Sequence, residues 1–355
     1  MRKLKHLPVD QWPEADIAAF AKAYEPGDIF DETAGPGAHL AEGTRRMIET
    51  TYRRWLGFLT AHDPSALLVP PAERMTPDGL RAFVELLSVQ VRTTTVAHTV
   101  DNLHYAARLI DPDRDWTWLA SLDAGLAARA EPGDRFNHLV PAWQTLSLGI
   151  ELMDKALTSP NPSHKESEIQ YRDGFLVALL SLWPIRRRSL TALTVSRHVE
   201  FVDGGMNLLL HPEDTKAKRS ESFRVPDELL PYLQHYLNEI RPRLIGHYKH
   251  DGLWASLKGC PLTAGRIYDI VRALTYAKFG KAMGLHDFRR AAATFIAMDA
   301  PDKVGLIPGV LQHASPEVSE QHYNLARSVE ASRRFAAHNS KIRDRLRPVL
   351  PKSGG

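Results

Sequence analysis

The side-chain types near the end of the chain, and their spacing, suit chemistry at a phosphodiester. His286 and Arg289 lie three positions apart, so on a helix they project from one face as a pair of hydrogen-bond donors. His313 follows as a third donor, and Tyr323 then supplies a phenolic hydroxyl. A phosphodiester repels nucleophiles, and its transition state spreads negative charge over oxygens that fixed donors stabilise. The order of these residues therefore predicts attack by a tyrosine on a phosphodiester without a metal ion.

The order H-x-x-R, then H, then Y resembles the C-terminal signature of the tyrosine recombinases, also called the phage integrase family. Residues 311–315 stand where that family typically has L-G-H-x-S, with Gln312 in place of the glycine. Residues 184–193 follow the family pattern G-L-R-x-x-E-L-x-x-L, and this register selects Arg186 as a first catalytic arginine. The acid of that pattern is Ser189 here, so another group must orient Arg186, or its orientation is weaker.

Residues 214–219, ahead of residues 223–226, resemble the family's β-hairpin that carries a catalytic lysine. Lys216 is the candidate for that lysine, and Lys218 is the reserve. The resemblance thus implies a set of six catalytic residues: Arg186, Lys216, His286, Arg289, His313 and Tyr323.

The resemblance also implies a mechanism. Arg186 and Arg289 would each present a rigid fork of donors to the phosphate oxygens, which lysine does less well. The phenol of Tyr323 has an ordinary pKa of about 10, so it needs a base or a cationic site before it can attack. His286 is the expected acceptor of that proton, and Lys216 would protonate the departing 5′ oxygen. The product would be a 3′-phosphotyrosyl intermediate, formed without a metal or nucleotide cofactor.

Taken singly, the same residues have structural explanations. Residues 186–188 could form a solvated basic corner, and a polar turn at 214–219 could simply be exposed. His286 and Arg289 could be a pair that stabilises the fold. Tyr323 could be a half-buried tyrosine, and His322 competes for any role given to its neighbour. Their occurrence together and in order favours the catalytic interpretation.

The composition of the chain allows this function without requiring it. With 355 residues, 43% of them hydrophobic, the chain can bury a sizeable core, and two domains are expected. The formal charge of +3 and the pI near 8.9 permit a nucleic acid partner. The single Cys260 excludes an internal disulfide and a multi-cysteine zinc site. Without a long apolar run or an apolar leader, a soluble, cytoplasmic and nucleoid-associated protein is expected.

Cofactor motifs are missing from the sequence. No H-E-x-x-H pattern occurs, and the histidine pairs His98/His104 and His247/His250 lack a nearby carboxylate or thiolate set at ligand spacing. Neither G-x-x-x-x-G-K-[ST] nor G-x-G-x-x-G occurs. We therefore expect no metal and no cofactor.

The elements that must position these residues are mostly helical. Apolar periodicity, caps and prolines predict helices over residues 16–24, 42–62, 76–91, 92–110, 116–130, 139–157, 165–182, 227–241, 264–280, 286–298 and 303–313. Short strands are predicted at 199–202, 206–210 and 223–225. The fold class is thus mainly α with a small antiparallel β-sheet. It comprises a helical core-binding domain and an α+β catalytic domain.

The best linker candidate is the segment 131–134, Glu-Pro-Gly-Asp. We expect an N-terminal arm over residues 1–40, a helical core-binding (DNA-binding) domain over 41–131, a catalytic domain over 135–327, and a basic tail over 328–355. By the resemblance, the tail would dock on a neighbouring protomer.

Double-stranded DNA with inverted repeats is the partner that the resemblance implies. The protein would form a dimer on one site and a tetramer in synapsis, with no membrane partner. Basic side chains and threonine hydroxyls near helix starts commonly bind phosphates. The candidate DNA-binding residues are Arg45, Arg46, Arg92, Thr94, Arg187, Arg188 and Lys218.

Two other functions stay open. A type IB topoisomerase uses the same chemistry but relaxes supercoils as a monomer. An accessory DNA-binding protein derived from the family, with impaired catalysis, is the second alternative, and the absent acid at Ser189 is its support.

Overall fold

The computed structural model describes residues 4–28, 34–131, 138–158, 164–215 and 218–299, and within these ranges the side chains of residue 164 and residues 296–299 are not described. The predicted catalytic residues Lys216, His313 and Tyr323 lie outside the described residues, as do the predicted helix 303–313 and the tail 328–355. The chain divides into two compact units between Asp134 and Arg135.

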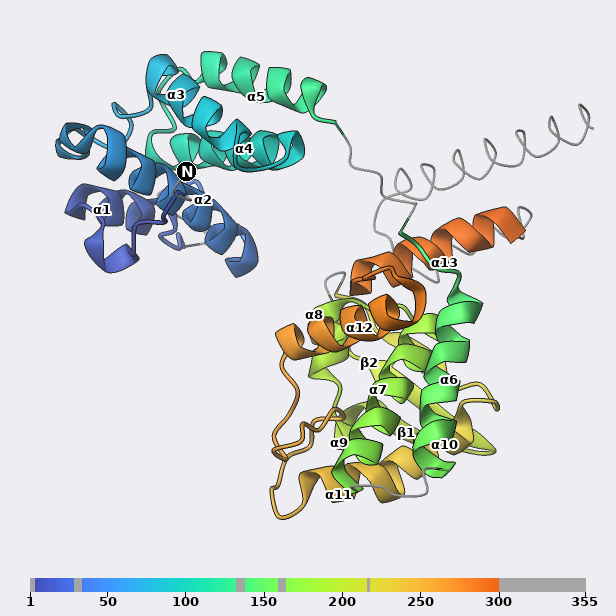
Figure 1. The fold of residues 1–355 in the computed structure, drawn as a ribbon. Helices are drawn as coiled ribbons and strands as arrows, with labels where there is room; N and C mark the ends of the chain where they lie inside the picture. Colours follow the sequence, from blue (N-terminus) through green and yellow to red (C-terminus); the bar gives the residue numbers. More distant parts are fainter. Residues whose placement is uncertain (1–3, 29–33, 132–137, 159–163, 216–217, 300–355) are drawn as a thin grey trace, which may run out of the picture. The chain divides into compact units, whose positions relative to one another are not determined.

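The N-terminal unit is built on long helices. Its core depends on α2, where apolar residues at helical spacing bury one face, including Ile48, Tyr52, Trp55 and Leu59. This face packs with buried residues of α4, such as Leu103. The α-helices of this unit, shown in Figure 1, are α1 (Glu14–Ala23), α2 (Glu42–His62), α3 (Pro77–Ser88), α4 (Thr93–Ile110) and α5 (Thr117–Arg129).

The first residues of the described chain are part of this core. The side chains of Leu7, Trp12 and Phe20 are buried, and the Trp12 and Phe20 rings contact the Tyr52 ring at centroid distances of 5.4 and 5.0 Å. Beside them, Asp16 accepts hydrogen bonds from Tyr52 Oη (2.5 Å) and Arg74 Nη1 (2.7 Å to Oδ2). The Arg74–Asp16 ion pair is almost completely excluded from solvent, so each charge depends on the other.

In the second unit, two helices form the centre of the core. Figure 1 shows α6 (Ala142–Thr158) and α7 (His164–Leu182) running side by side. Their backbones approach closely at Gly149 and Gly174. A Cβ added to Gly149 would lie 2.6 Å from the Gly174 carbonyl oxygen, so the close approach requires glycine. Every side chain from Phe175 to Leu180 is buried, so α7 is covered on all sides. Pro184 follows the helix and prevents its continuation.

A small antiparallel sheet lies in the same unit. Its strands β1 (Val199–Val202), β2 (Gly205–Leu210) and β3 (Glu221–Arg224) pair in that order. Gly204 makes the turn between β1 and β2 with φ +71°, a conformation that favours glycine. The side chain of Leu208 is buried in the centre, opposite Val199 on one side and Phe223 on the other.

The remaining helices correct one expectation. The single helix predicted over 227–241 is instead α10 (Leu230–His235), a π-helical turn (Tyr236–Ile240) and α11 (Arg241–Ile245). Pro242 has no N–H to donate, so the regular bonding pattern is interrupted where the π turn meets α11. Two short helices that the sequence did not predict, α8 (Arg187–Ala192) and α9 (Val195–His198), follow Pro184, and α12 (Ala264–Phe279) and α13 (Leu285–Asp299) complete the described chain. The predicted fold class, mainly α with a small antiparallel sheet, is confirmed.

Candidate active site

Arg186 lies at the N-cap of α8, just after the turn that Trp183 and Pro184 make at the end of α7. Its side chain is half-buried, whereas those of Arg187 and Arg188 are exposed. The fold therefore distinguishes the three consecutive arginines, and Arg186 is the one held against the protein.

Arg289 lies on α13, and its side chain is only 6% exposed. Its Nη1 donates a hydrogen bond to the carbonyl oxygen of Pro184. Burial and the nearby charge of Arg186 lower the pKa of Arg289 to about 10, while the carboxylate of Glu221 acts in the opposite direction. The guanidinium remains cationic at neutral pH. Because charges act strongly only over short distances and Arg289 bonds the carbonyl oxygen two residues before Arg186, the two arginines belong to one site.

His286 precedes Arg289 by one helical turn and is exposed. Partial burial lowers the pKa of His286, as do the charges of Arg289 and Arg290, while Asp287 raises it. Asp287 also caps the start of α13, because its Oδ2 accepts from the Gly284 N–H at 2.8 Å. A lowered pKa keeps the imidazole neutral at pH 7, so it can accept a proton there.

The hairpin between β2 and β3 is anchored at Asp214. The Oδ2 atom of Asp214 lies 3.1 Å from His198 Nε2 and accepts from the His211 N–H at the same distance. His198 Nδ1 accepts from the Thr194 N–H, so the ring proton sits on Nε2 and is donated to Asp214. Although burial raises it, the pKa of Asp214 is lowered overall by these hydrogen bonds and by Arg197.

Asp214 is also connected to the helix that follows Arg186. The buried Ser189 hydroxyl donates to the Asp214 carbonyl oxygen at 2.7 Å. The residue that stands in place of the expected acid thus joins α8 to the hairpin. Lys218, the reserve lysine, is exposed and has φ +51°. The anchored residues lie immediately before Lys216 in the chain.

Comparisons with known proteins were made on the sequence and on the fold. No model of a protein family matches the chain. Tyrosine recombinase XerD of Chlorobaculum tepidum is 25% identical over 260 residues, which cover 72% of this chain and 79% of the relative. Over most of its length the chain is therefore similar to a tyrosine recombinase, and the predicted resemblance to that family is confirmed.

Two solved structures share the fold of this chain. Both are of the XerH site-specific recombinase bound to its difH substrate. The post-cleavage complex, with a palindromic substrate, superposes with a TM-score of 0.57 at 14% identity and covers 92% of this chain and 99% of that chain. The pre-cleavage complex also gives a TM-score of 0.57, at 15% identity, and covers 90% and 93%.

Of the six predicted catalytic residues, the structure brings together Arg186, His286 and Arg289. Sequence reasoning missed two residues beside them: Glu221, whose charge acts on Arg289, and Asp214 as the anchor of the hairpin. Glu221 stands two residues before the predicted strand 223–225, and no local pattern names its partner.

The predicted DNA-binding residues of the N-terminal unit differ in their exposure and in the contacts that their side chains make within the protein. Arg45 donates to the carbonyl oxygens of Ala38 and Leu40 and lies over the Tyr24 ring, so its fork has structural partners. Arg46 pairs with Glu42 at the surface. Arg92 is exposed at the N-cap of α4, and Thr94 is partly buried in its first turn.

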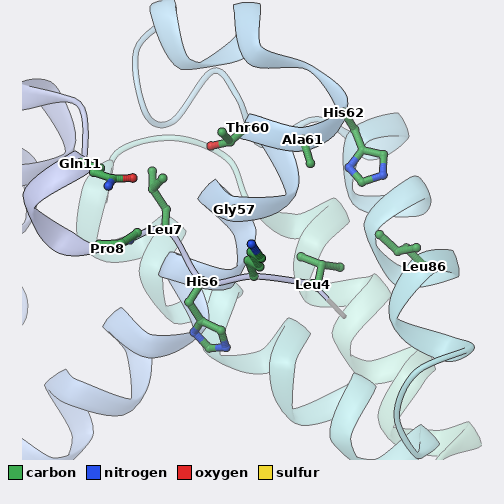
Figure 2. Close-up of a pocket in the computed structure, with 11 residues that line it drawn as sticks. Leu4, His6, Leu7, Pro8, Gln11, Gly57, Thr60, Ala61, His62 and Leu86 are labelled. Carbon is green, nitrogen blue, oxygen red and sulfur yellow. The ribbon is translucent and has the colours of Figure 1, made fainter. Parts of the chain in front are cut away.

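The N-terminal unit also contains a cavity of about 540 Å³ (Figure 2). Leu4, Leu7, Pro8 and Leu86 supply apolar walls, and His62 lies at one side. The predicted catalytic and DNA-binding residues that the structure describes are not among its lining residues.

The described residues contain neither a candidate metal site nor a candidate membrane-spanning helix. Within these ranges, no three His, Cys, Asp or Glu side chains gather in a way that could hold a metal ion. Among the described helices, none has the length and apolar character needed to cross a bilayer.

Proposed function

We propose that this protein is a site-specific DNA recombinase that cleaves and rejoins DNA strands through a 3′-phosphotyrosyl intermediate. The observation that carries the proposal is the meeting of Arg186 and Arg289, far apart in sequence, in one partly buried site. Two cations placed side by side at a cost in repulsion are suited to an anion with charge on two oxygens, which is what a phosphodiester presents. The similarity to tyrosine recombinase XerD supports the same conclusion.

The side chains of Arg289 and Arg186 differ in how firmly the protein holds them. Arg289 is buried and bonded to the Pro184 carbonyl, so its guanidinium is preorganised. Arg186 is half-buried and can contact the phosphate from the solvent side. Preorganised donors stabilise the developing charge without reorganising during the reaction, which is their main catalytic advantage.

The covalent step is a displacement at phosphorus. The phenolic oxygen of Tyr323 forms a bond to phosphorus as the bond to the 5′ oxygen breaks. The phenol proton passes to neutral His286, and Lys216 gives a proton to the departing oxygen. Because the phosphotyrosyl ester retains the energy of the original bond, a 5′ hydroxyl of another strand reverses the step. The balance needs no ATP and no metal.

The partner in this proposal is double-stranded DNA with inverted repeats, bound by a dimer and joined in a tetramer at synapsis. The XerH recombinase bound to a palindromic substrate supports this choice. Exposed basic residues on both units, including Arg92, Arg187 and Lys218, would bind phosphates. We further propose that residues 41–131 form the core-binding domain and residues 135–327 the catalytic domain, that the tail 328–355 docks on a neighbouring protomer, and that the protein associates with the nucleoid.

The experiment uses a duplex selected from a random pool by repeated binding to the full chain. A nick placed near the cleaved phosphate lets the short product diffuse away and traps the covalent adduct. We expect an adduct with the wild type and none with Tyr323→Phe, while Tyr276→Phe, at an exposed tyrosine of α12, behaves as wild type. An adduct that persists in Tyr323→Phe contradicts the proposal. Tight binding with no adduct indicates the accessory protein, and supercoil relaxation without strand exchange indicates the topoisomerase.

A further inference from the structure

Glu221, the first residue of β3, faces the interior of the second unit. Along this strand Glu221 and Phe223 are half-buried, whereas the alternate residues Ser222 and Arg224 are exposed. Across the sheet, Glu221 pairs with Leu210 and Phe223 pairs with Leu208, and both leucines are buried. Since directly paired residues share one face of a sheet, the Glu221 side chain is on the core face. A carboxylate there needs a cation to offset the loss of solvent.

The same face of β3 covers the turn that leads into Arg186 and accepts a hydrogen bond from Arg289. The Phe223 ring stacks on the Trp183 ring at a centroid distance of 5.2 Å and an angle of 6°. Trp183 directly precedes Pro184, whose carbonyl oxygen accepts from Arg289. Glu221 therefore lies on the strand face that packs against this turn.

The charges of Arg186 and Glu221 act on the pKa of Arg289 in opposite directions. Arg186 lowers the pKa of Arg289, and Glu221 raises it. Two guanidinium groups in one partly buried site repel, and a carboxylate beside them offsets that repulsion. Position 189 supplies no such charge, because the Ser189 hydroxyl donates to the Asp214 carbonyl oxygen instead.

We propose that Glu221 is a positioning residue whose carboxylate holds Arg186 and Arg289 together in the geometry that receives the phosphate. This inference rests on the proposed function for its catalytic consequence. The electrostatic pairing of Glu221 with Arg289 does not depend on that function and can be measured without DNA.

The first test is a double-mutant cycle on thermal stability with the full chain. Glu221→Gln keeps the shape of the side chain and removes its charge, so we expect the melting temperature to fall by about 2–6 °C. In the Arg289→Gln background the same change should cost less than about 1 °C, because the cation that it pairs with is gone. Glu200→Gln is the matched control, since Glu200 is exposed on β1 of the same sheet. Equal losses in both backgrounds overturn the proposal.

The second test measures adduct formation on the nicked duplex described above. We expect Glu221→Gln to slow cleavage about 10–100-fold with little change in the Kd for the duplex, and Glu221→Asp to recover much of the rate. A Glu221→Gln variant that cleaves like the wild type overturns the positioning role. If the wild type forms no adduct but the stability cycle shows coupling, the proposed function fails while the Glu221–Arg289 pairing stands.

Discussion

The buried guanidinium of Arg289 donates a hydrogen bond to the main-chain oxygen of Pro184, two residues before Arg186. One of the two proposed catalytic arginines thus fixes the turn from which the other projects. This relationship joins α13 to the end of α7 and makes the two arginines mutually dependent, so a change at either should disturb both.

Arg289→Lys should abolish most of the cleavage activity while leaving DNA binding nearly intact. Lysine retains the charge but has no planar fork, so it cannot bond the Pro184 oxygen and a phosphate together. We expect the rate of adduct formation to fall by about 10²–10³-fold. Single-turnover cleavage and the Kd for the duplex are the measurements. Arg272→Lys, at an exposed arginine of α12, should cleave like the wild type. Equal losses in the two variants would contradict the assignment.

His286 should titrate below the ordinary histidine value of 6.5, because partial burial and the charges of Arg289 and Arg290 lower its pKa. Arg290→Gln removes one of those charges and should raise the pKa of His286. NMR of the histidine ring as a function of pH measures both values, and an unchanged pKa in the variant would refute the electrostatic explanation.

The lowered pKa of His286 makes both stability and cleavage depend on pH. The folded protein holds His286 in its neutral form, so the contribution of His286 to stability is present above pH 6.5. It is lost as the pH falls from 6.5 towards the lowered pKa. Cleavage should decline over the acidic range where His286 gains a proton, and in Arg290→Gln the decline should begin at a higher pH.

Ser189→Ala should loosen the hairpin that carries Lys216. The change removes the hydrogen bond to the Asp214 carbonyl oxygen, at a cost of about 1 kcal/mol in unfolding free energy. We expect a larger proportional effect on cleavage than on binding, because the lysine would be held less firmly. Thr191→Ala removes a hydroxyl that bonds within the same helix, to the Arg187 carbonyl, and serves as the control. A Ser189→Ala enzyme with an unaltered cleavage rate would rule out this linkage.

Asp16→Ala should strongly destabilise the N-terminal unit. It leaves the Arg74 guanidinium buried without its carboxylate, which costs about 3–5 kcal/mol. Glu42→Ala breaks the exposed Arg46–Glu42 pair and should cost less than about 1 kcal/mol. Urea unfolding monitored by tryptophan fluorescence compares the two, and similar losses would show that the buried pair has no special weight.

Elements with long, regular periodicity were predictable from the sequence. Residues 42–62 were predicted as one helix and form α2 with the same bounds, because four large apolar residues recur on one face. The helix predicted over 227–241 was wrong in its bounds and regularity, since Pro242 supplies no N–H where the π turn meets α11. The apolar periodicity of a segment does not show whether its hydrogen bonds follow the α or the π pattern.

Some residues of the candidate site were also predictable from local sequence patterns, and others were not. Arg186, His286 and Arg289 follow from motifs in which each residue is defined by its neighbours in the chain. Glu221 and Asp214 are defined by partners from distant segments, through strand register and through a main-chain oxygen. No local spacing encodes either relationship, so only the folded chain reveals them.

The bond from Ser189 ends on a backbone atom of Asp214, whereas the carboxylate of Asp214 is bound separately by His198. A main-chain acceptor is present whatever the neighbouring side chains are. The link from α8 to position 214 can therefore survive substitution of the Asp214 side chain, whereas the link to His198 cannot. Evolution can change the residue at this position without detaching the hairpin from the helix that follows the first arginine.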